Sequence, residues 1–257
     1  MKRVAIVTGA SSGVGKEFVR QFDHGKGGPL DEIWIVARSE QRLNEVASSC
    51  TKVQVRTFAC DLTQAESFSG ISQALEEENA EIEWLINSAG FGKFGDYRSV
   101  GPEQNANMVR LNCLAVVQAI SMALPHMVAG SRIINLSSIA GAIPQVMLAT
   151  YSATKAFVLE LSRMLDHELK PCGIRVLAVC PKFMKTGFLD NPGDQEAAEG
   201  MCRIGYERVE RVVSVALRRA ILGKDLCIPS FEMRLAYLAS RLMPRSALFA
   251  LEDALFR

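Results

Sequence analysis

The sequence predicts an α/β fold in which helices cover both faces of a doubly wound parallel sheet. Short runs rich in valine and isoleucine recur along the chain, and most of them are apolar at consecutive positions. Such runs are typical of strands that are buried on both faces of a parallel sheet. Stretches with apolar residues at helical spacing separate these runs, so strands and helices alternate and right-handed crossovers connect the strands.

Six strands are expected before residue 180. They are Val4–Val7, Ile33–Val36, Val53–Phe58, Trp84–Ile86, Arg132–Leu136 and Arg175–Val179. The helices expected between them are Val14–Phe22, Ser39–Ser48, Ala65–Glu77, Glu103–Met127 and Tyr151–Lys170. No linker divides the chain and no repeat has the period of a solenoid, so we expect one domain over residues 1–257.

The pattern changes after the sixth strand. Residues 186–205 contain an NPGD turn sequence and several glycines, and we expect them to form a mobile segment on the substrate side. A helix is expected over Tyr206–Leu222 and an extended pair at Ile228–Pro229. Residues 231–257 are expected to form a C-terminal helical extension that begins with the amphipathic stretch Phe231–Met243. That stretch packs on the domain or on another subunit, or it lies on a membrane surface.

Composition excludes several classes of function. A formal net charge of +1 gives no basic footprint for nucleic acid. The seven cysteines form no CxxC pair, which indicates reduced thiols in a cytosolic protein, and the three histidines are too far apart to predict a metal site. No unbroken run reaches roughly 18 apolar residues, and the four apolar residues after Lys2 and Arg3 are too few for a signal peptide. We expect a soluble cytoplasmic protein without an integral membrane segment.

A glycine-rich loop follows the first predicted strand. The stretch Thr8–Lys16 reads TGASSGVGK, with glycines at positions 9, 13 and 15. Glycine lets the backbone approach a ligand closely, and the N-terminus of the following helix offers free N–H groups to a pyrophosphate. The phosphate loop of nucleotide triphosphatases is excluded, because Ala10 stands at its first glycine position and Glu17 at its serine or threonine position. The loop therefore indicates a dinucleotide site, with a plain tight turn as the alternative.

The end of the second strand indicates which dinucleotide binds. An acidic residue there hydrogen-bonds the ribose 2′-hydroxyl of NAD, whereas an arginine accommodates the 2′-phosphate of NADP. This chain has Ala37, Arg38 and Ser39 at that point, and a guanidinium pairs with a phosphate through two hydrogen bonds. We therefore expect NADP(H) to be favoured over NAD(H). The alternative is that Arg38 is a solvated residue at the start of a helix.

Ser138, Tyr151 and Lys155 form a candidate reaction centre. Tyr151 and Lys155 are four residues apart, so they share one face of a helix. A phenol has a reference pKa of about 10, and an ammonium one turn away is expected to lower that pKa and to favour proton transfer. Ser138 follows the fifth strand, where its hydroxyl can donate to a carbonyl oxygen as charge develops there. Taken alone, a tyrosine and a lysine at this spacing also fit an ordinary helix start.

Six motifs together resemble the short-chain dehydrogenase/reductase family, whose members have a Rossmann-type fold in a single domain. The motifs are TGASSGVG at 8–15, Asp61 in CDLT, NSAG at 87–90, Asn112 in RLNCLAV, Ser138 after RIINLS, and YSATK at 151–155. The resemblance covers roughly residues 1–190 and implies an NADP(H)-dependent enzyme that acts on CH–OH donors and the corresponding carbonyls. One departure is Ser12, where the family has its other basic position.

The resemblance also implies a role for each site residue. The catalytic residues would be Ser138, Tyr151, Lys155 and Asn112, of which Asn112 holds a water in a proton relay to Lys155. Tyr151 and Lys155 would also contact the cofactor. The remaining cofactor-binding residues would be Gly9, Ser11, Ser12, Gly13, Val14 and Gly15 at the phosphates and ribose, Asp61 and Leu62 at the adenine, and Asn87, Ala89 and Gly90 along the cleft. Asn87 would also brace the sheet, and Asp61 taken alone is as plausibly a helix N-cap.

The segment after the sixth strand departs from the family pattern, because the glycine that usually follows its proline is Lys182 here. Pro181, the backbone at Met184 and the hydroxyl of Thr186 are still expected to hold the nicotinamide end of the cofactor. Lys182 and Lys185 either meet an acidic tail of the substrate or face solvent, and we favour solvent.

The substrate pocket is expected between residues 90–97, residues 139–148 and the segment from Thr186. Its candidate walls are largely apolar: Phe91, Phe94, Ile139, Ile143, Val146, Met147 and Phe188. They predict a bulky apolar substrate, such as a hydroxysteroid or a 3-oxoacyl chain. The alternatives are a reductase of small polar ketones or sugars and a dinucleotide-binding sensor or scaffold without chemistry. Family members pair through the two long helices at 103–127 and 151–170, so the resemblance implies a homodimer or homotetramer.

Overall fold

The computed structural model of the chain describes residues 1–143, 145, 147–184, 205–244 and 246–250. Within these residues, seven strands form one parallel sheet in the order β3-β2-β1-β4-β5-β6-β7. The strands are β1 (Lys2–Thr8), β2 (Glu32–Ala37), β3 (Gln54–Ala59), β4 (Ala80–Asn87), β5 (Arg132–Leu136), β6 (Arg175–Val179) and β7 (Leu226–Cys227). The strand order reverses between β1 and β4, which is where open sheets of this kind bind their ligands.

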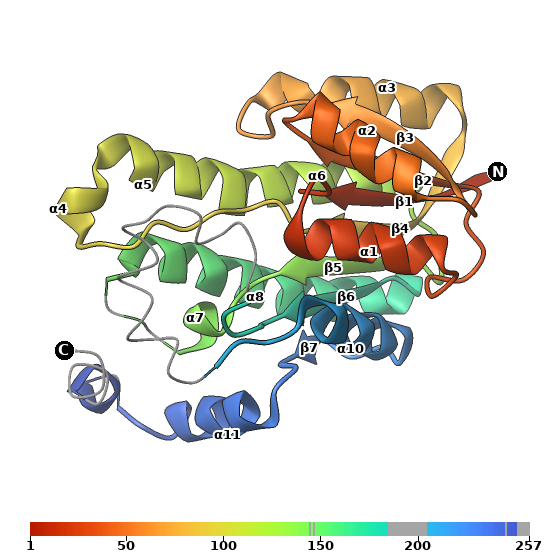
Figure 1. Cartoon of the computed structure of the whole chain (residues 1–257). Coiled ribbons are helices and arrows are strands. Elements are labelled where there is room, and N and C mark those ends of the chain that lie inside the picture. The colour runs from red at the N-terminus through yellow and green to blue at the C-terminus, as the bar shows by residue number, and fades with distance from the viewer. Residues whose placement is uncertain (144, 146, 185–204, 245, 251–257) are drawn as a thin grey trace.

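Helices cover both faces of the sheet, so the predicted doubly wound architecture is confirmed (Figure 1). The helices are α1 (Gly13–Asp23), α2 (Glu40–Ser49) and α10 (Val209–Ile221) on one face, and α3 (Ser69–Glu77, after a 3₁₀ turn at Ala65–Phe68), α6 (Ala115–Ala123) and α8 (Ala149–Leu169) on the other. Successive strand residues face opposite layers: Val7 packs in the cluster of Phe18, whereas Ile6 packs in the cluster of Leu75. This is why the strands are apolar at consecutive positions.

β3 departs from the expected burial on both faces, because it lies at the edge of the sheet. Its residues are half-buried or exposed. The guanidinium of Arg56 lies 5.2 Å from the ring centroid of Trp34 and 5.1 Å from that of Phe58, and it pairs with Glu78. A charged residue on an exposed edge strand discourages pairing with another chain.

The segment Pro102–His126 is one continuous helix that changes its winding along its length. It consists of α5 (Pro102–Val109), a π-helical turn (Arg110–Leu114), α6, and a 3₁₀ turn (Leu124–His126). Among the described residues it is the one helix that could cross a membrane by length and composition. Of its most apolar 18-residue window, 39% is buried, and Ala119 and Ile120 pack in the core beneath the sheet. Core helices of soluble proteins meet the same criterion.

The C-terminal part of the chain adds an edge strand and a peripheral helix. The extended pair predicted at Ile228–Pro229 lies two residues earlier, as β7, and the helix α11 (Phe231–Ser240) follows it. Met233 of α11 packs with Ile139 of the short helix α7 (Ile139–Ala142), whereas Leu235 and Leu238 are exposed. The segment predicted to be mobile at 186–205 lies outside the described residues except for Gly205, as do residues 251–257 of the predicted extension.

Candidate active site

The carboxyl ends of the central strands open into a cleft of about 1340 Å³. It lies at the point where the strand order reverses, with Gly9 after β1, Ala89 after β4 and Ser138 after β5 on its walls. The predicted site residues that line it are Gly9, Ser11, Ser12, Gly13, Val14, Gly15, Arg38, Asp61, Leu62, Ala89, Gly90, Ser138, Tyr151, Lys155, Pro181 and Met184. Asn87 and Asn112 are buried behind the lining, and Thr186 lies outside the described residues.

The glycine loop is packed so tightly that it excludes side chains at two positions. Gly9 has a φ of +66°, and a Cβ there would meet the Cα of Ala89 at 2.8 Å. A Cβ at Gly15 would lie 2.3 Å from the carbonyl oxygen of Gly9. α1 begins at Gly13, and the side chain of Ser12 makes no capping hydrogen bond to its first N–H groups. The loop and the uncapped helix N-terminus therefore fit a pyrophosphate.

Thr8 and Ser88 tie this loop to the segment after β4. The hydroxyl oxygen of Thr8 accepts hydrogen bonds from the backbone N–H groups of Ser88 and Ala89, at 3.1 and 3.2 Å. The hydroxyl of Ser88 in turn donates to the carbonyl oxygen of Thr8. Neither side chain was predicted to have a role, although both belong to motifs that the sequence analysis identified. Their hydrogen bonds fix the two loops on either side of the strand-order reversal.

Asn87 points into the sheet instead of the cleft. Its Nδ2 donates to Oδ1 of Asn135 at 2.9 Å, and Nδ2 of Asn135 donates to the hydroxyl of Ser162 at 2.9 Å. All three side chains are buried. This chain of hydrogen bonds joins β4, β5 and α8, so the position of the strand ends is coupled to the helix that carries the candidate reaction centre.

α8 and the end of β5 bring Ser138, Tyr151 and Lys155 together. The Ser138 hydroxyl shares a hydrogen bond with Tyr151 and accepts one from the backbone N–H of Ala140 at 3.2 Å, as the N-cap of α7. Lys155 is 6% exposed, and its Nζ donates to the carbonyl oxygen of Leu136 at 2.7 Å. Three polar groups, two from α8 and one from the start of α7, thus converge at the wall of the cleft.

The pKa of Tyr151 differs from the sequence-based expectation. The ammonium of Lys155 was expected to lower it, but burial raises the pKa of Tyr151 to about 12, with the hydrogen bond from Ser138 opposing the rise. Burial also lowers the pKa of Lys155 to about 8. Desolvation is therefore the largest influence on both pKa values. The ammonium of Lys155 hydrogen-bonds the carbonyl oxygen of Leu136 instead of the phenol.

Asn112 lies in the π-helical turn and holds the segment after β4. Its Oδ1 accepts from the backbone N–H of Phe91 at 3.1 Å, and its Nδ2 donates to the Phe91 carbonyl at 2.9 Å and to the hydroxyl of Thr154 at 3.1 Å. Gly90 fits between this amide and Lys155, because a Cβ there would lie 2.9 Å from Oδ1 of Asn112 and 3.3 Å from Nζ of Lys155. The side chain of Asn112 thus supports the cleft from behind, and its part in a water relay stays a prediction.

Two arginines mark the opposite end of the cleft. Arg38 follows β2, and Arg42 lies one turn further along, on the helix that Ser39 caps by accepting from the Arg42 N–H at 3.3 Å. Both are exposed, and in the part of the chain that the structure describes neither has a carboxylate within ion-pair distance. Arg42 was missed, although its spacing of four residues from Arg38 was a usable signal. This pair of cations fits a phosphate group.

Asp61 lines the cleft between these arginines and the glycine loop without capping a helix. Its Oδ1 accepts from the backbone N–H of Thr63 at 3.0 Å and from the Thr63 hydroxyl at 2.9 Å. The 3₁₀ turn that follows begins only at Ala65. The alternative that Asp61 is the N-cap of a helix starting at Leu62 is therefore wrong, and its carboxylate instead stabilises a local turn.

Among the residues that the structure describes, the substrate end of the cleft is more polar than predicted. Of the expected walls, Phe91 and Ile139 line it, Phe94 packs behind it against Phe183, and Ile143 and Met147 do not line it. Val146, Phe188 and Lys185 lie outside the described residues. Lys93 and Gln145, which lie in the predicted ranges 90–97 and 139–148, also line it. The lining residues that sequence reasoning missed are Gln104, Asn107, Leu111 and Phe183. Gln104 and Asn107 belong to α5, and the sequence alone does not show that this helix reaches the cleft.

Lys182 does not face solvent as expected. Its side chain is only 10% exposed, and its Nζ lies 2.6 Å from Oε1 of Glu232 on α11. The carboxylate is 50 residues away along the chain, so no local pattern indicated the pair.

Comparison with known proteins agrees with this geometry. The sequence model of the short chain dehydrogenase family matches residues 3–197, and the chain belongs to that family. Human very-long-chain 3-oxoacyl-CoA reductase is 32% identical over 192 residues, which are 71% of this chain and 59% of that protein. A short-chain dehydrogenase from Sphingobium yanoikuyae in complex with NADPH superposes with a TM-score of 0.80 at 28% identity, covering 97% of this chain and 96% of that one. An alcohol dehydrogenase from Comamonas testosteroni that is specific for bulky-bulky ketones gives 0.75 at 28% identity, covering 94% and 92%.

Proposed function

We propose that this protein is an NADP(H)-dependent oxidoreductase that transfers hydride between the nicotinamide and a carbonyl or secondary alcohol. One observation carries the proposal: Ser138, Tyr151 and Lys155 converge on the wall of a cleft whose other end holds the glycine loop and two arginines. A site that only senses a dinucleotide has no need of a half-buried tyrosine and a buried lysine beside a serine hydroxyl. Their joint presence therefore favours catalysis over a sensor or scaffold.

Each residue of the reaction centre has a distinct part in the proposed mechanism. The bound dinucleotide supplies or accepts the hydride. Tyr151, whose raised pKa keeps the phenol protonated, delivers the proton to the carbonyl oxygen during reduction. The Ser138 hydroxyl orients that oxygen, and the ammonium of Lys155 stabilises the phenolate that forms on Tyr151. In oxidation the same groups work in reverse, so the phenolate accepts the proton of the alcohol.

NADP(H) is the cofactor that the adenine end favours. Arg38 and Arg42 offer two guanidinium groups at the end of β2, where a 2′-phosphate lies in this type of fold. No acidic side chain stands at the end of β2 to hydrogen-bond a ribose 2′-hydroxyl, since the strand ends at Ala37 and continues into Arg38 and Ser39. The relative of known structure from Sphingobium yanoikuyae holds NADPH, which supports the same choice.

A bulky carbonyl compound with an apolar body is the substrate class that the lining supports. Phe91, Leu111, Ile139 and Phe183 give apolar contact, while Gln104, Asn107 and Gln145 can bind a polar group at the margin. A 3-oxoacyl chain and a ketone with two large substituents both have this character, and they are the substrates that the names of two similar proteins state. Small polar ketones and sugars are the alternative that the amides allow.

The test of the proposed function is NADPH oxidation against a panel of ketones. The panel contains 3-oxoacyl thioesters, oxo-steroids, aryl ketones with two large substituents, small diketones and sugars, each also run with NADH. We expect turnover of at least one bulky ketone with NADPH favoured. Turnover confined to sugars or small diketones would overturn the substrate class, and NADPH binding without turnover of any member would favour a sensor.

We also propose that two copies associate through the long helix Pro102–His126 and α8. These two elements pack side by side in the monomer, and they leave apolar side chains exposed at Val109, Leu114, Val117, Phe157 and Met164. Sedimentation equilibrium on the wild type and on Phe157→Glu tests this: the wild type should be a dimer or tetramer, and the variant should shift toward monomer. A monomeric wild type would contradict it.

A cytoplasmic location without membrane attachment completes the proposal. The cysteines within the described residues are all unpaired thiols, as expected in a reducing compartment. Attachment to a membrane surface is the alternative location. One observation favours it, because Phe231, Leu235 and Leu238 form an exposed apolar stripe on α11. Co-sedimentation with anionic liposomes should leave the protein in the supernatant, whereas pelleting that is lost in Leu235→Glu would place α11 on the bilayer.

A further inference from the structure

Lys182 joins the segment after β6 to the C-terminal helix. Its Nζ lies 2.6 Å from Oε1 of Glu232, in the first turn of α11, and its side chain is only 10% exposed. The hydrogen bond from Lys182 holds the pKa of Glu232 below its usual value, with a smaller contribution from Arg211. The carboxylate of Glu232 is therefore charged at neutral pH, and the pair is partly shielded from water on the lysine side.

The same segment is also held through its backbone. The N–H of Lys182 donates to Oε2 of Glu207 at 3.0 Å, and the N–H of Glu207 donates to the carbonyl oxygen of Phe183 at 2.8 Å. Met184 and Glu207 form an isolated parallel bridge. A glycine at position 182 could make the same backbone hydrogen bonds. The ion pair with Glu232 is thus a contact that does depend on a lysine side chain.

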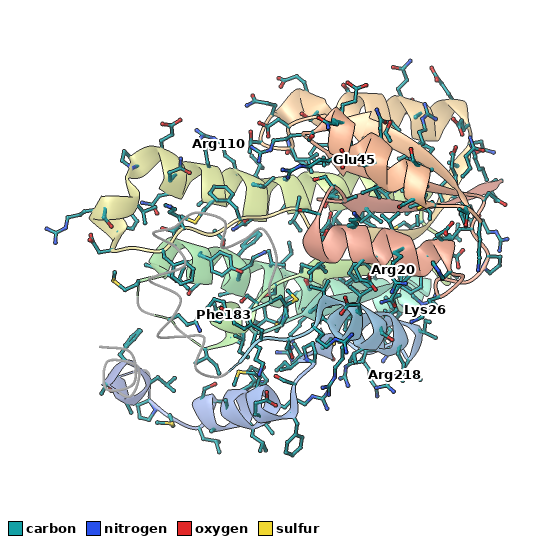
Figure 2. All side chains as sticks on the ribbon, viewed as in Figure 1. Arg20, Lys26, Glu45, Arg110, Phe183 and Arg218 are labelled. Carbon is teal, nitrogen blue, oxygen red and sulfur yellow. The ribbon has the colours of Figure 1, made fainter. Side chains whose placement is uncertain are left out.

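The segment that Lys182 holds is part of the cleft wall. The carbonyl oxygen of Pro181 accepts from the N–H of Ile139 at 2.9 Å, directly beside Ser138. The ring of Phe183 stacks on that of Phe94, with 6.2 Å between centroids and 27° between planes. Figure 2 labels Phe183 at this end of the sheet. A shift of the segment would therefore move both the start of α7 and the aromatic wall.

α11 has a second attachment close to the same place. Met233, one residue after Glu232, is 8% exposed and packs in the apolar cluster of Ile139, Ala178 and Cys180. The helix thus contacts α7 through its apolar side and the segment 181–184 through Glu232. A rigid helix that is anchored at two points can hold the segment between them in one position.

We propose that Lys182 is a positioning residue: its ion pair with Glu232 makes α11 a support for the wall formed by residues 181–184. We therefore expect a substitution at Glu232 of α11 to weaken the binding of the carbonyl substrate, although Glu232 does not contact that substrate. The expected change in substrate binding rests on the proposed function. The claim that Glu232 holds residues 181–184 in position does not depend on that function.

Hydrogen–deuterium exchange tests the link without any substrate. The proteins are the wild type, Lys182→Met, Glu232→Gln and the double variant. The control is Glu210→Gln, which removes an exposed pair with Arg208 (3.6 Å) whose two residues do not line the cleft. We expect faster exchange in the peptide that covers residues 181–184 in all three variants and unchanged exchange in the control. Unchanged exchange in Glu232→Gln overturns the proposal, even if the ketone panel shows no turnover.

Kinetics on the same proteins test the consequence. Each single variant should raise KM for the ketone about fivefold with little change in kcat, as expected for the loss of a partly buried ion pair, while the Tm stays near wild type. The double variant should lose no more than the larger single variant, because one interaction is removed in all three. The cycle also cancels any separate effect of Glu232 on the N-terminus of α11. Additive losses, or a KM that does not move although exchange has risen, contradict a positioning role.

Discussion

The ammonium of Lys155 lies over the ring of Tyr151, with 5.7 Å between Nζ and the ring centroid. Its hydrogen bond goes to the carbonyl of Leu136. Tyr151 is half-buried on the cleft wall and Lys155 is buried, and the loss of water around them moves their pKa values in opposite directions, to about 12 for Tyr151 and about 8 for Lys155. Near neutral pH the site therefore holds a neutral phenol beside a cation, which is the state required to protonate a carbonyl oxygen.

This arrangement predicts the pH dependence of carbonyl reduction. The pKa of Lys155 lies below its ordinary value, so the ammonium is present below about pH 8 and is lost as the pH rises through that value. Because kcat/KM reports the groups of the free enzyme, it should be level from pH 6 to 7.5 and fall above about pH 8. Tyr151 remains protonated over this range. A rate of reduction that stays constant up to pH 10 would contradict the role given to Lys155.

Arg38 and Arg42 should set the cofactor preference. Arg38→Asp places a carboxylate where a 2′-phosphate is proposed, so we expect the Kd of NADPH to rise roughly tenfold to a hundredfold and the Kd of NADH to change little. Arg42→Ala should weaken NADPH alone and to a smaller degree. Arg98→Ala is the matched control, because Arg98 is an exposed arginine of α4 (Tyr97–Val100) outside the cleft. Fluorescence titration with both cofactors measures these values, and equal losses for NADPH and NADH in Arg38→Asp would refute the assignment.

Gly15 should tolerate no side chain. A Cβ there would lie 2.3 Å from the carbonyl oxygen of Gly9, which is backbone and cannot move without opening the loop. Gly15→Ala is therefore expected to abolish dinucleotide binding in a titration. Gly70→Ala is the control, since a Cβ at Gly70 in α3 would meet nothing within 4 Å and should stabilise the fold by about 0.5–1 kcal/mol. Normal binding by Gly15→Ala would mean that the loop is looser than described.

The buried hydrogen-bond chain should contribute to the free energy of unfolding. Asn135→Ala leaves the buried Nδ2 of Asn87 without its acceptor, so we expect a loss of about 1–3 kcal/mol in urea denaturation. Replacing both Asn87 and Asn135 by alanine should cost less than the sum of the single changes, because the two residues interact directly. Strictly additive losses would show that their 2.9 Å hydrogen bond contributes nothing.

The sequence predicted the fold well because its signals are local. Consecutive apolar residues identified five strands buried on both faces, and the glycine loop identified the start of α1. The edge position of β3 was not predictable in this way, since it depends on which strand has no neighbour. The winding change at Arg110–Leu114 was likewise hidden, because a π-helical turn keeps the apolar spacing of a longer helix.

The site residues that belong to sequence motifs could be predicted. The site residues that are brought together only by contacts between distant parts of the chain could not. Ser138, Tyr151 and Lys155 were found from spacing and resemblance, and the structure brings them to one cleft. The pair of Lys182 with Glu232 joins residues 50 positions apart and had no local signal. The pKa of Tyr151 was predicted in the wrong direction, because a sequence shows that a lysine is near but not how much water both groups have lost.

Comparison of wild type with Tyr151→Phe in NADPH oxidation is the most direct test of the central claim. The substitution removes only the phenolic oxygen, so NADPH should bind with nearly unchanged Kd while kcat for the best ketone of the panel falls by roughly a thousandfold or more. That result would assign proton delivery to Tyr151. A variant that binds NADPH and still reduces the ketone at a rate near wild type would contradict the account.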